Sequence, residues 1–338
     1  MNNKEALLVN EYRGGLLECS HYGHICLINE QGEIAGQAGN PHATVFTRSS
    51  AKPIQAIPGI RAGIKAAFGL SDDEVAVMAA SHRAEKIHVG TLERLLGKAG
   101  LAEEGLVCAP SLPLDEEAKE TLLRRGGERR RLYHNCSGKH LGVLAYSKLK
   151  GYPLDGYNLP DHPVQREILQ TLATLADIPQ ERISLGTDGC GFPVFALPLS
   201  ALAAAYLKLA CPDLIADPAT AEAAATITGA MNRHPLLVAG TGRVDSILLE
   251  DPNIVAKGGF KGVYAFALRR ERLAVTFKVQ DGSEDEWGLI ALGVLEQLGY
   301  ENEETLRKLR EAFPSSITND EGWLVGHMET VFSLNRRD

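Results

Sequence analysis

Two residue types that can cooperate in nucleophilic catalysis stand three positions apart early in the chain. Ser49 and Lys52 belong to the segment RSSAKP at residues 48–53. Residues three apart on a helix lie on one face, so the hydroxyl and the amine could meet. Pro53 is tolerated only in a first helical turn, which predicts a helix that begins at or just before Ser49. The alternative is a serine that caps the helix and a lysine in solvent.

A serine hydroxyl is a weak nucleophile at neutral pH and needs a base within hydrogen-bond reach. A lysine can be that base if burial or another cation lowers its pKa. At a helix start, free N–H groups and the positive end of the dipole could also hold a developing oxyanion. The pattern around Ser49 therefore indicates acyl-transfer chemistry if its context is right.

A second concentration of reactive side chains is HNCSGKH, at residues 134–140. Such a density of thiol, amine and imidazole groups is rarely needed for packing alone, and helical spacing would place Cys136 and Lys139 on one face. The glycine-rich segment TDGCGFP, at residues 187–193, carries Cys190. Its glycines would let backbone N–H groups approach a ligand, or mark only a tight bend. Residue types alone favour two buried free thiols over a metal site.

Further polar segments stand where a site could draw on them. Ser81, in ASHRAE at residues 80–85, lies between two expected helices, where a serine either points into a cleft or caps a helix. Arg243, in the turn GTGRVD, could hold a carboxylate in a forked geometry. Glu18 and His21 frame a small polar cluster between the first strands, and a histidine near a turn is more often a surface residue than a catalyst.

The composition is typical of a globular protein that acts on small molecules. The chain has 338 residues, enough for a large core, and its 44% apolar and 23% charged residues do not support disorder. A net charge of -8 and a pI near 5.7 argue against binding to nucleic acid or acidic membranes. The arginine-rich part of residues 115–131 is expected to be a solvated helix end and loop.

The chain begins with a polar stretch and a short apolar run rather than a signal peptide, and no apolar stretch reaches membrane-spanning length. Six cysteines are scattered along the chain, which fits a reduced compartment better than a disulfide framework. We therefore expect a cytoplasmic protein.

The elements that must position these residues predict an α/β (α+β) fold. We expect an antiparallel sheet assembled from both termini and packed beside helices, in a single catalytic domain over residues 1–338. Its sheet-containing lobe should comprise residues 1–60 and 180–338, and its mainly helical lobe residues 61–179. Strand-like segments are 6–9, 24–29, 263–268 and 273–279. Helical segments are 75–80, 88–99, 141–148, 162–175, 199–209, 219–231 and, as the last one, 287–298.

Together, RSSAKP, ASHRAE, HNCSGKH, TDGCGFP, GTGRVD and KGGFKG resemble the asparaginase II family, the class 3 L-asparaginases, over residues 11–326. The resemblance implies a fold similar to serine β-lactamases and serine-dependent glutaminases, and a homodimer that hydrolyses L-asparagine. It implies that Ser49 is the nucleophile with Lys52 as its partner, and that Ser81 and Lys257 form a second pair. It also implies a zinc ion, whose ligands would be a water, Cys136, Lys139 and Cys190. Substrate-binding residues are expected to be Arg48, His82, Asp188 and Arg243.

Two segments depart from the family's pattern. Asn-Gly usually follows Ser-His, whereas this chain has Arg83-Ala84. Ala-Glu usually precedes the last glycine of the KGGFKG segment, whereas this chain has Phe260-Lys261. Two alternatives therefore stay open: a Ser-Lys hydrolase that acts on a β-lactam or peptide amide, and a zinc-bearing small-molecule binding protein without catalysis.

Overall fold

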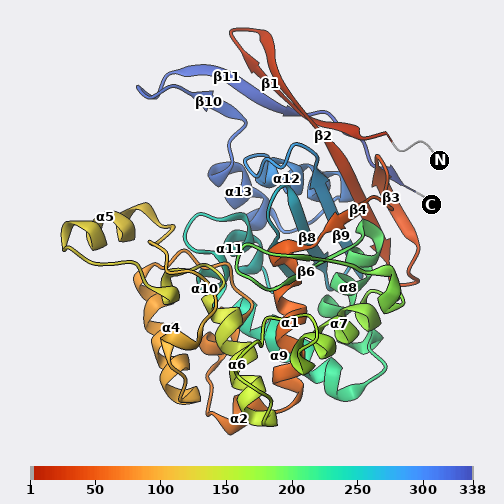
Figure 1. The fold of residues 1–338 in the computed structure, drawn as a ribbon. Coiled ribbons are helices and arrows are strands. Elements are labelled where there is room, and N and C mark those ends of the chain that lie inside the picture. Colours follow the sequence, from red (N-terminus) through yellow and green to blue (C-terminus); the bar gives the residue numbers. More distant parts are fainter. Residues whose placement is uncertain (1–3, 337–338) are drawn as a thin grey trace.

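The computed structural model describes residues 4–336, which form a fold of the α+β class (Figure 1). Within these residues nine strands form an antiparallel main sheet in the order β10-β11-β1-β2-β9-β8-β7, with β3 paired to β2 and β12. Both ends of the chain supply these strands, as predicted. Their bounds are β1 Ala6–Arg13, β2 Leu16–Asn29, β3 Ile34–Ala38, β7 Ile254–Gly258, β8 Val263–Leu268, β9 Leu273–Val279, β10 Ser316–Thr318, β11 Leu324–Thr330 and β12 Asn335–Arg336.

Strand β2 belongs to two environments. Its second half, residues 23–28, is buried and lies between β3 and β9. Every residue of β8, which pairs with β9, is buried too. Its first half is mostly exposed and pairs with β1, which in turn pairs with β11. In Figure 1 this part of β2 projects from the body together with β1, β10 and β11, and we call these four segments the ribbon.

Helices pack against the main sheet and against one another. Helix α8 packs across β2, β8 and β9, and α1 packs against α6, α7 and α9. No helix of residues 4–336 is both long and apolar enough to cross a bilayer. The bounds are α1 Lys52–Arg61, α2 Ile64–Ala67, α3 Asp72–Met78, α4 Lys86–Ala99, α5 Glu116–Arg124, α6 Ser137–Lys150, α7 Pro163–Leu175, α8 Leu199–Ala210, α9 Pro218–Arg233, α10 Pro235–Ala239, α11 Val244–Leu249, α12 Trp287–Leu298 and α13 Glu303–Ala312.

A small second sheet lies next to the start of α1 and includes the strand that leads into it. Its strands β4 (Thr44–Phe46), β5 (Ser184–Thr187) and β6 (Pro193–Pro198) are antiparallel in the order β4-β6-β5. The turn between β5 and β6 carries Cys190, and β4 leads directly into the 3-10 turn Arg48–Ala51 before α1. The N–H of Thr47 donates to the carbonyl of Phe195 at 2.8 Å. Two motifs that lie far apart in the sequence are thereby fixed side by side.

The predicted helix start is confirmed, because the 3-10 turn Arg48–Ala51 continues into α1 with Pro53 in its first turn. The predicted end of the helical part is wrong. A further helix, α13, and the strands β10 and β11 follow α12, where the sequence pattern predicted no more helices.

Candidate functional site

A cavity of about 520 Å³ opens where distant segments of the chain meet. Of the residues predicted for a site, it is lined by Arg48, Ser49, Ser81, Cys136, Asp188, Cys190, Arg243 and Lys257. Two more lie directly behind this wall: Lys52 is hydrogen-bonded to Ser81, and Lys139 to Cys190. The structure therefore brings together all but one of the predicted site residues.

Ser49 lies in the 3-10 turn that opens α1, where its side chain lines the cavity and the residue is 8% exposed. Among residues 4–336, neither its hydroxyl nor its backbone N–H has a hydrogen-bond partner. The preceding residue, Arg48, has a φ of 50°, a left-handed conformation that is costly for a residue with a side chain. The strained residue thus stands directly before the serine that lines the cavity.

The ammonium group of Lys52 is held by three acceptors. It donates to the carbonyl of Ala80 at 2.6 Å, to Ser81 Oγ at 3.0 Å and to the carbonyl of Asn135 at 3.2 Å. Its hydrogen bonds therefore go to the second serine of the predicted site, and none of them reaches Ser49. Ser81 lies between the amine and the cavity, where a hydroxyl can pass a proton in either direction.

Burial is the main cause that lowers the pKa of Lys52 to about 8. The sulfur of Cys136 opposes this shift, and the charges of Lys139 and Lys257 add to it. A buried ammonium group without a carboxylate is costly, so the neutral amine gains population. Near pH 8 this lysine is both a proton donor and a proton acceptor.

Lys257, in β7, has a carboxylate partner that the sequence pattern did not single out. Its ammonium group donates to Asp245 Oδ2 at 2.7 Å and to the carbonyl of Gly258 at 2.9 Å. Asp245 Oδ1 accepts from the N–H of Gly258 at 2.9 Å. Burial alone would raise the pKa of Asp245, but the charge and hydrogen bond of Lys257, together with hydrogen bonds from Gly258 and Tyr264, hold the pKa below the ordinary value. No hydrogen bond joins Lys257 to Ser81 among the residues described.

Asp245 follows the singled-out Arg243 by two residues, in α11. One general signal could have found it: a lysine predicted to be buried needs a counter-ion, and GTGRVD offers a carboxylate. The chain has many carboxylates, and the packing of α11 against β7 decides which one reaches Lys257. The local sequence does not predict this packing.

Cys136 and Lys139 lie at the start of α6, and Cys190 reaches them from the β5–β6 turn. Lys139 Nζ is 3.1 Å from Cys190 Sγ. A hydrogen bond between the two thiols is the largest cause that holds the pKa of Cys136 well below its usual range, and the charges of Lys52 and Lys139 add to it. Of the two thiols, Cys136 is therefore the one whose ionised form is favoured.

The chemistry of this donor set fits zinc. Cys190 interacts with both the amine of Lys139 and the sulfur of Cys136, and zinc accepts thiolate and nitrogen ligands. Lys139 must lose a proton to serve. Burial favours this loss, although the two sulfurs together with the charge of Asp188 outweigh burial and raise the pKa of Lys139. We call Cys136, Lys139 and Cys190 the thiol–lysine cluster.

The four residues predicted to bind substrate differ in their contacts and in their position relative to the cavity. Arg48 Nη2 pairs with Asp188 Oδ1 at 2.7 Å on the cavity wall. Arg243 lines the cavity, and within residues 4–336 its side chain makes neither a hydrogen bond nor an ion pair. His82 is fully buried, with one ring nitrogen on Ser137 and the other accepting from the N–H of Ala84. The structure does not place His82 in the cavity wall.

The polar cluster predicted around Glu18 and His21 is not part of this cavity. Glu18 forms an exposed ion pair with Arg13. The expected surface position of His21 is wrong, because this residue is buried between Glu11 and Glu286. These three residues form a possible metal-binding set.

The family model of L-asparaginase II matches residues 9–330, nearly the whole chain. A comparison with curated protein sequences finds no match. Similar solved structures include a β-lactamase from Mycobacterium bovis, with 14% identity and a TM-score of 0.41 over 84% of this chain and 95% of that chain. Another is a class C β-lactamase from Rhodobacter sphaeroides, with 16% identity and a TM-score of 0.42 over 88% of this chain and 96% of that chain. At such low values these structures say nothing of what this chain binds.

Proposed function

Because this chain belongs to the L-asparaginase II family, we propose that it hydrolyses the side-chain amide of L-asparagine to aspartate and ammonia. One observation carries the proposal beyond the family. Two serines and two buried lysines from four separate segments meet at one cavity, beside two cysteines. Such a set can generate a nucleophile and move protons without any group from solvent.

Ser49 Oγ attacks the amide carbon and forms the new C–O bond. Its proton passes to neutral Lys52, through Ser81 Oγ, which is 3.0 Å from Lys52 Nζ. The tetrahedral intermediate collapses as the C–N bond breaks, and the same relay returns the proton to the leaving amine, which departs as ammonia. Water then attacks the Ser49 ester, aspartate leaves, and Ser49 regains its proton.

Charge on the oxyanion needs fixed positive groups in the cavity. The free N–H of Ser49 is one, since it has no partner among the described residues and belongs to the turn that carries the nucleophile. Loss of such a donor typically costs roughly 2.7 to 4 kcal/mol of barrier. The ammonium group of Lys257 is the second, and its hydrogen bond to Asp245 holds it in place.

Recognition of the amino acid falls to Arg243, whose guanidinium is free to take the α-carboxylate in a forked geometry. Cys136, Lys139 and Cys190 would hold zinc at the other side of the cavity. When bound, zinc supplies a positive charge that orients a polar group of the substrate rather than a nucleophile, because Ser49 already provides one.

Ammonia and aspartate release by the Ser49→Ala variant tests the proposal. We expect turnover to fall by at least about 10³-fold, since removal of a nucleophile removes the whole covalent route. Ser50→Ala is the matched control: its hydroxyl donates to the carbonyl of Thr47 and does not line the cavity. Turnover that persists in Ser49→Ala would exclude Ser49 as the nucleophile.

Two parallel measurements separate the alternatives. Hydrolysis of a β-lactam by the wild-type protein without ammonia release from asparagine would point to the other Ser-Lys hydrolases. Calorimetric binding of asparagine by a protein that makes no aspartate would point to a binding protein.

A further inference from the structure

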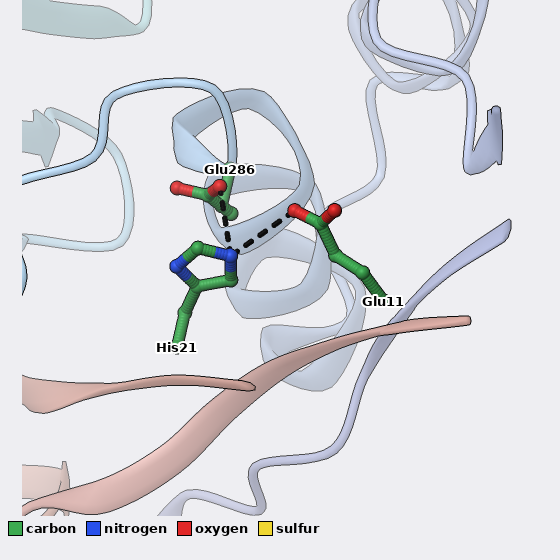
Figure 2. Close-up of side chains that lie close together, drawn as sticks. All are labelled: Glu11, His21 and Glu286. Atoms are coloured by element: carbon green, nitrogen blue, oxygen red, sulfur yellow. Dashed lines mark hydrogen bonds and ion pairs between the residues drawn. The ribbon is translucent and has the colours of Figure 1, made fainter. Parts of the chain in front are cut away.

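Outside the cavity, three potential metal ligands meet where the ribbon joins the body. Figure 2 shows Glu11 of β1 and Glu286, just before α12, both directed at His21 of β2. We propose that Glu11, His21 and Glu286 form a second metal site, which binds a divalent transition-metal ion such as Zn²⁺ or Mn²⁺. This site is independent of the proposed hydrolysis and of the thiol–lysine cluster.

The spacing of the donor atoms suits a metal ion. His21 Nε2 is 3.0 Å from Glu11 Oε1 and 3.2 Å from Glu286 Oε1, and the ligand atoms all lie within 4.8 Å of one another. Metal–ligand bonds of 2.0 to 2.2 Å place neighbouring donors roughly 3 Å apart, both in tetrahedral and in octahedral geometry. Small shifts of these side chains would therefore admit an ion.

The second ring nitrogen of His21 is already fixed. Asp281 Oδ2 lies 2.7 Å from His21 Nδ1. A carboxylate at this nitrogen fixes the tautomer and the ring orientation of metal-binding histidines, and leaves Nε2 as the ligand atom. Nε2 is the atom that faces both glutamates.

Glu286 gives an independent indication that a cation belongs here. Its side chain is 1% exposed, and its Oε2 has no hydrogen-bond partner among the described residues. Within residues 4–336, its Oε1 is paired with His21 and accepts a hydrogen bond from the hydroxyl of Ser283. A buried carboxylate oxygen without a donor is costly.

Charge points the same way. Three carboxylates, those of Glu11, Asp281 and Glu286, surround one imidazole, and no lysine or arginine of residues 4–336 pairs with any of them. A divalent cation would balance this charge better than the imidazole alone. Imidazole suits zinc and carboxylates suit manganese, so the mixed set selects for these ions over Ca²⁺ or Mg²⁺.

The ion would connect the ribbon to the cavity. Glu286 ends the loop that follows β9, and its neighbours Glu284, Asp285 and Trp287 line the cavity. Binding at Glu286 would therefore hold this part of the cavity wall against β1 and β2. The expected role is structural, because none of the three ligands lines the cavity itself.

Metal analysis of the protein tests the proposal. In a Cys136→Ser/Cys190→Ser background, where the thiol cluster cannot hold metal, we expect calorimetry to find one bound Zn²⁺ or Mn²⁺ per chain. His21→Gln in that background should weaken binding at least tenfold, whereas His327→Gln, an exposed histidine of the same ribbon, should leave it unchanged. Bound Co²⁺ should give only weak visible bands, without the intense thiolate charge-transfer band.

If the double variant does not fold, wild-type and His21→Gln proteins loaded with Zn²⁺ replace it, and the variant should lose one ion per chain. The proposal is overturned if the double variant takes up no metal, or if His21→Gln retains the wild-type metal content. It is also overturned if His21→Gln lowers the melting temperature equally with and without metal, because His21 is then only the centre of an ion-pair cluster. The outcome is separate from that of Ser49→Ala, which should abolish turnover without changing metal content.

Discussion

Two lysines at this cavity are buried to the same extent but differ in the partners of their amino groups. Lys52 and Lys257 are each 1% exposed. Lys257 is paired with the buried carboxylate of Asp245 at 2.7 Å. Among the described residues, Lys52 is hydrogen-bonded to two carbonyls and a hydroxyl but to no carboxylate, and its pKa falls to about 8.

The difference separates two roles that a lysine can have in catalysis. An amine that already sits near its pKa can accept and return a proton, whereas an amine with a counter-ion stays charged and acts as a fixed electrostatic group. The two also act on each other, since the charge of Lys257 helps to lower the pKa of Lys52. Each variant below tests one side of this comparison.

The largest effect is expected at Lys52. Lys52→Met should lower kcat by about 10²- to 10⁴-fold, the usual contribution of a general base. Lys52→Arg keeps the positive charge but cannot give up a proton near neutral pH, so we expect it to be as inactive as Lys52→Met. Steady-state rates of ammonia release measure both, with Lys65→Met, at a partly exposed lysine that does not line the cavity, as control. An active Lys52→Arg enzyme would show that only the charge matters.

Asp245→Asn should act on stability as well as on rate. The change leaves the ammonium group of Lys257 buried without a counter-ion, and breaking such a pair typically costs about 3 to 5 kcal/mol of unfolding free energy. Adding Lys257→Met should restore part of this loss, because the unpaired charge is then gone. Denaturant unfolding measures both variants. A loss below about 1 kcal/mol in Asp245→Asn would mean that water already solvates Lys257.

Much of the fold could be predicted because local signals were strong. Pro53 marks the first turn of α1, as the segment RSSAKP predicted. Helix α13 was missed because its sequence is highly charged and its buried side chains are only Thr305, Leu306 and Leu309. Strands β10 and β11 were missed because they lie in the ribbon, mostly exposed, so that no alternating apolar pattern marks them.

For the site, the sequence indicated which side chains meet but not how they pair. Both serines and both lysines could be named from the motifs, and all four converge. Their hydrogen bonds run from Lys52 to Ser81 and from Lys257 to Asp245, instead of within the expected pairs. Such choices depend on differences of about an ångström between packed segments, which residue spacing along the chain does not specify.

A smaller effect, on the pH dependence of kcat, links the two lysines. With a pKa of about 8, Lys52 is neutral in about one tenth of molecules at pH 7 and in about half at pH 8, so the rate should rise through this range. In Lys257→Met a cation beside Lys52 is lost, protonation of Lys52 becomes easier, and its pKa rises. The rising limb should therefore move to higher pH. Rate profiles from pH 6 to pH 9.5 would contradict the coupling if the limb stayed in place or moved down.

The smallest effect on the reaction is expected at Phe260, which lines the cavity but takes no part in proton transfer by the lysines. Phe260, one of the departures from the family's pattern, is 45% exposed, and the guanidinium of Arg48 lies over its ring at 5.0 Å.

An exposed cation–π contact is worth about 0.5 to 1 kcal/mol, so Phe260→Ala should raise KM by no more than about fivefold. Its kcat should hardly change, because the surroundings of Lys52 and Lys257 stay intact. Measuring kcat and KM separately for asparagine and glutamine checks this. A fall in kcat of tenfold or more would mean that this part of the wall positions the reacting amide, and the separation between wall and lysines would no longer hold.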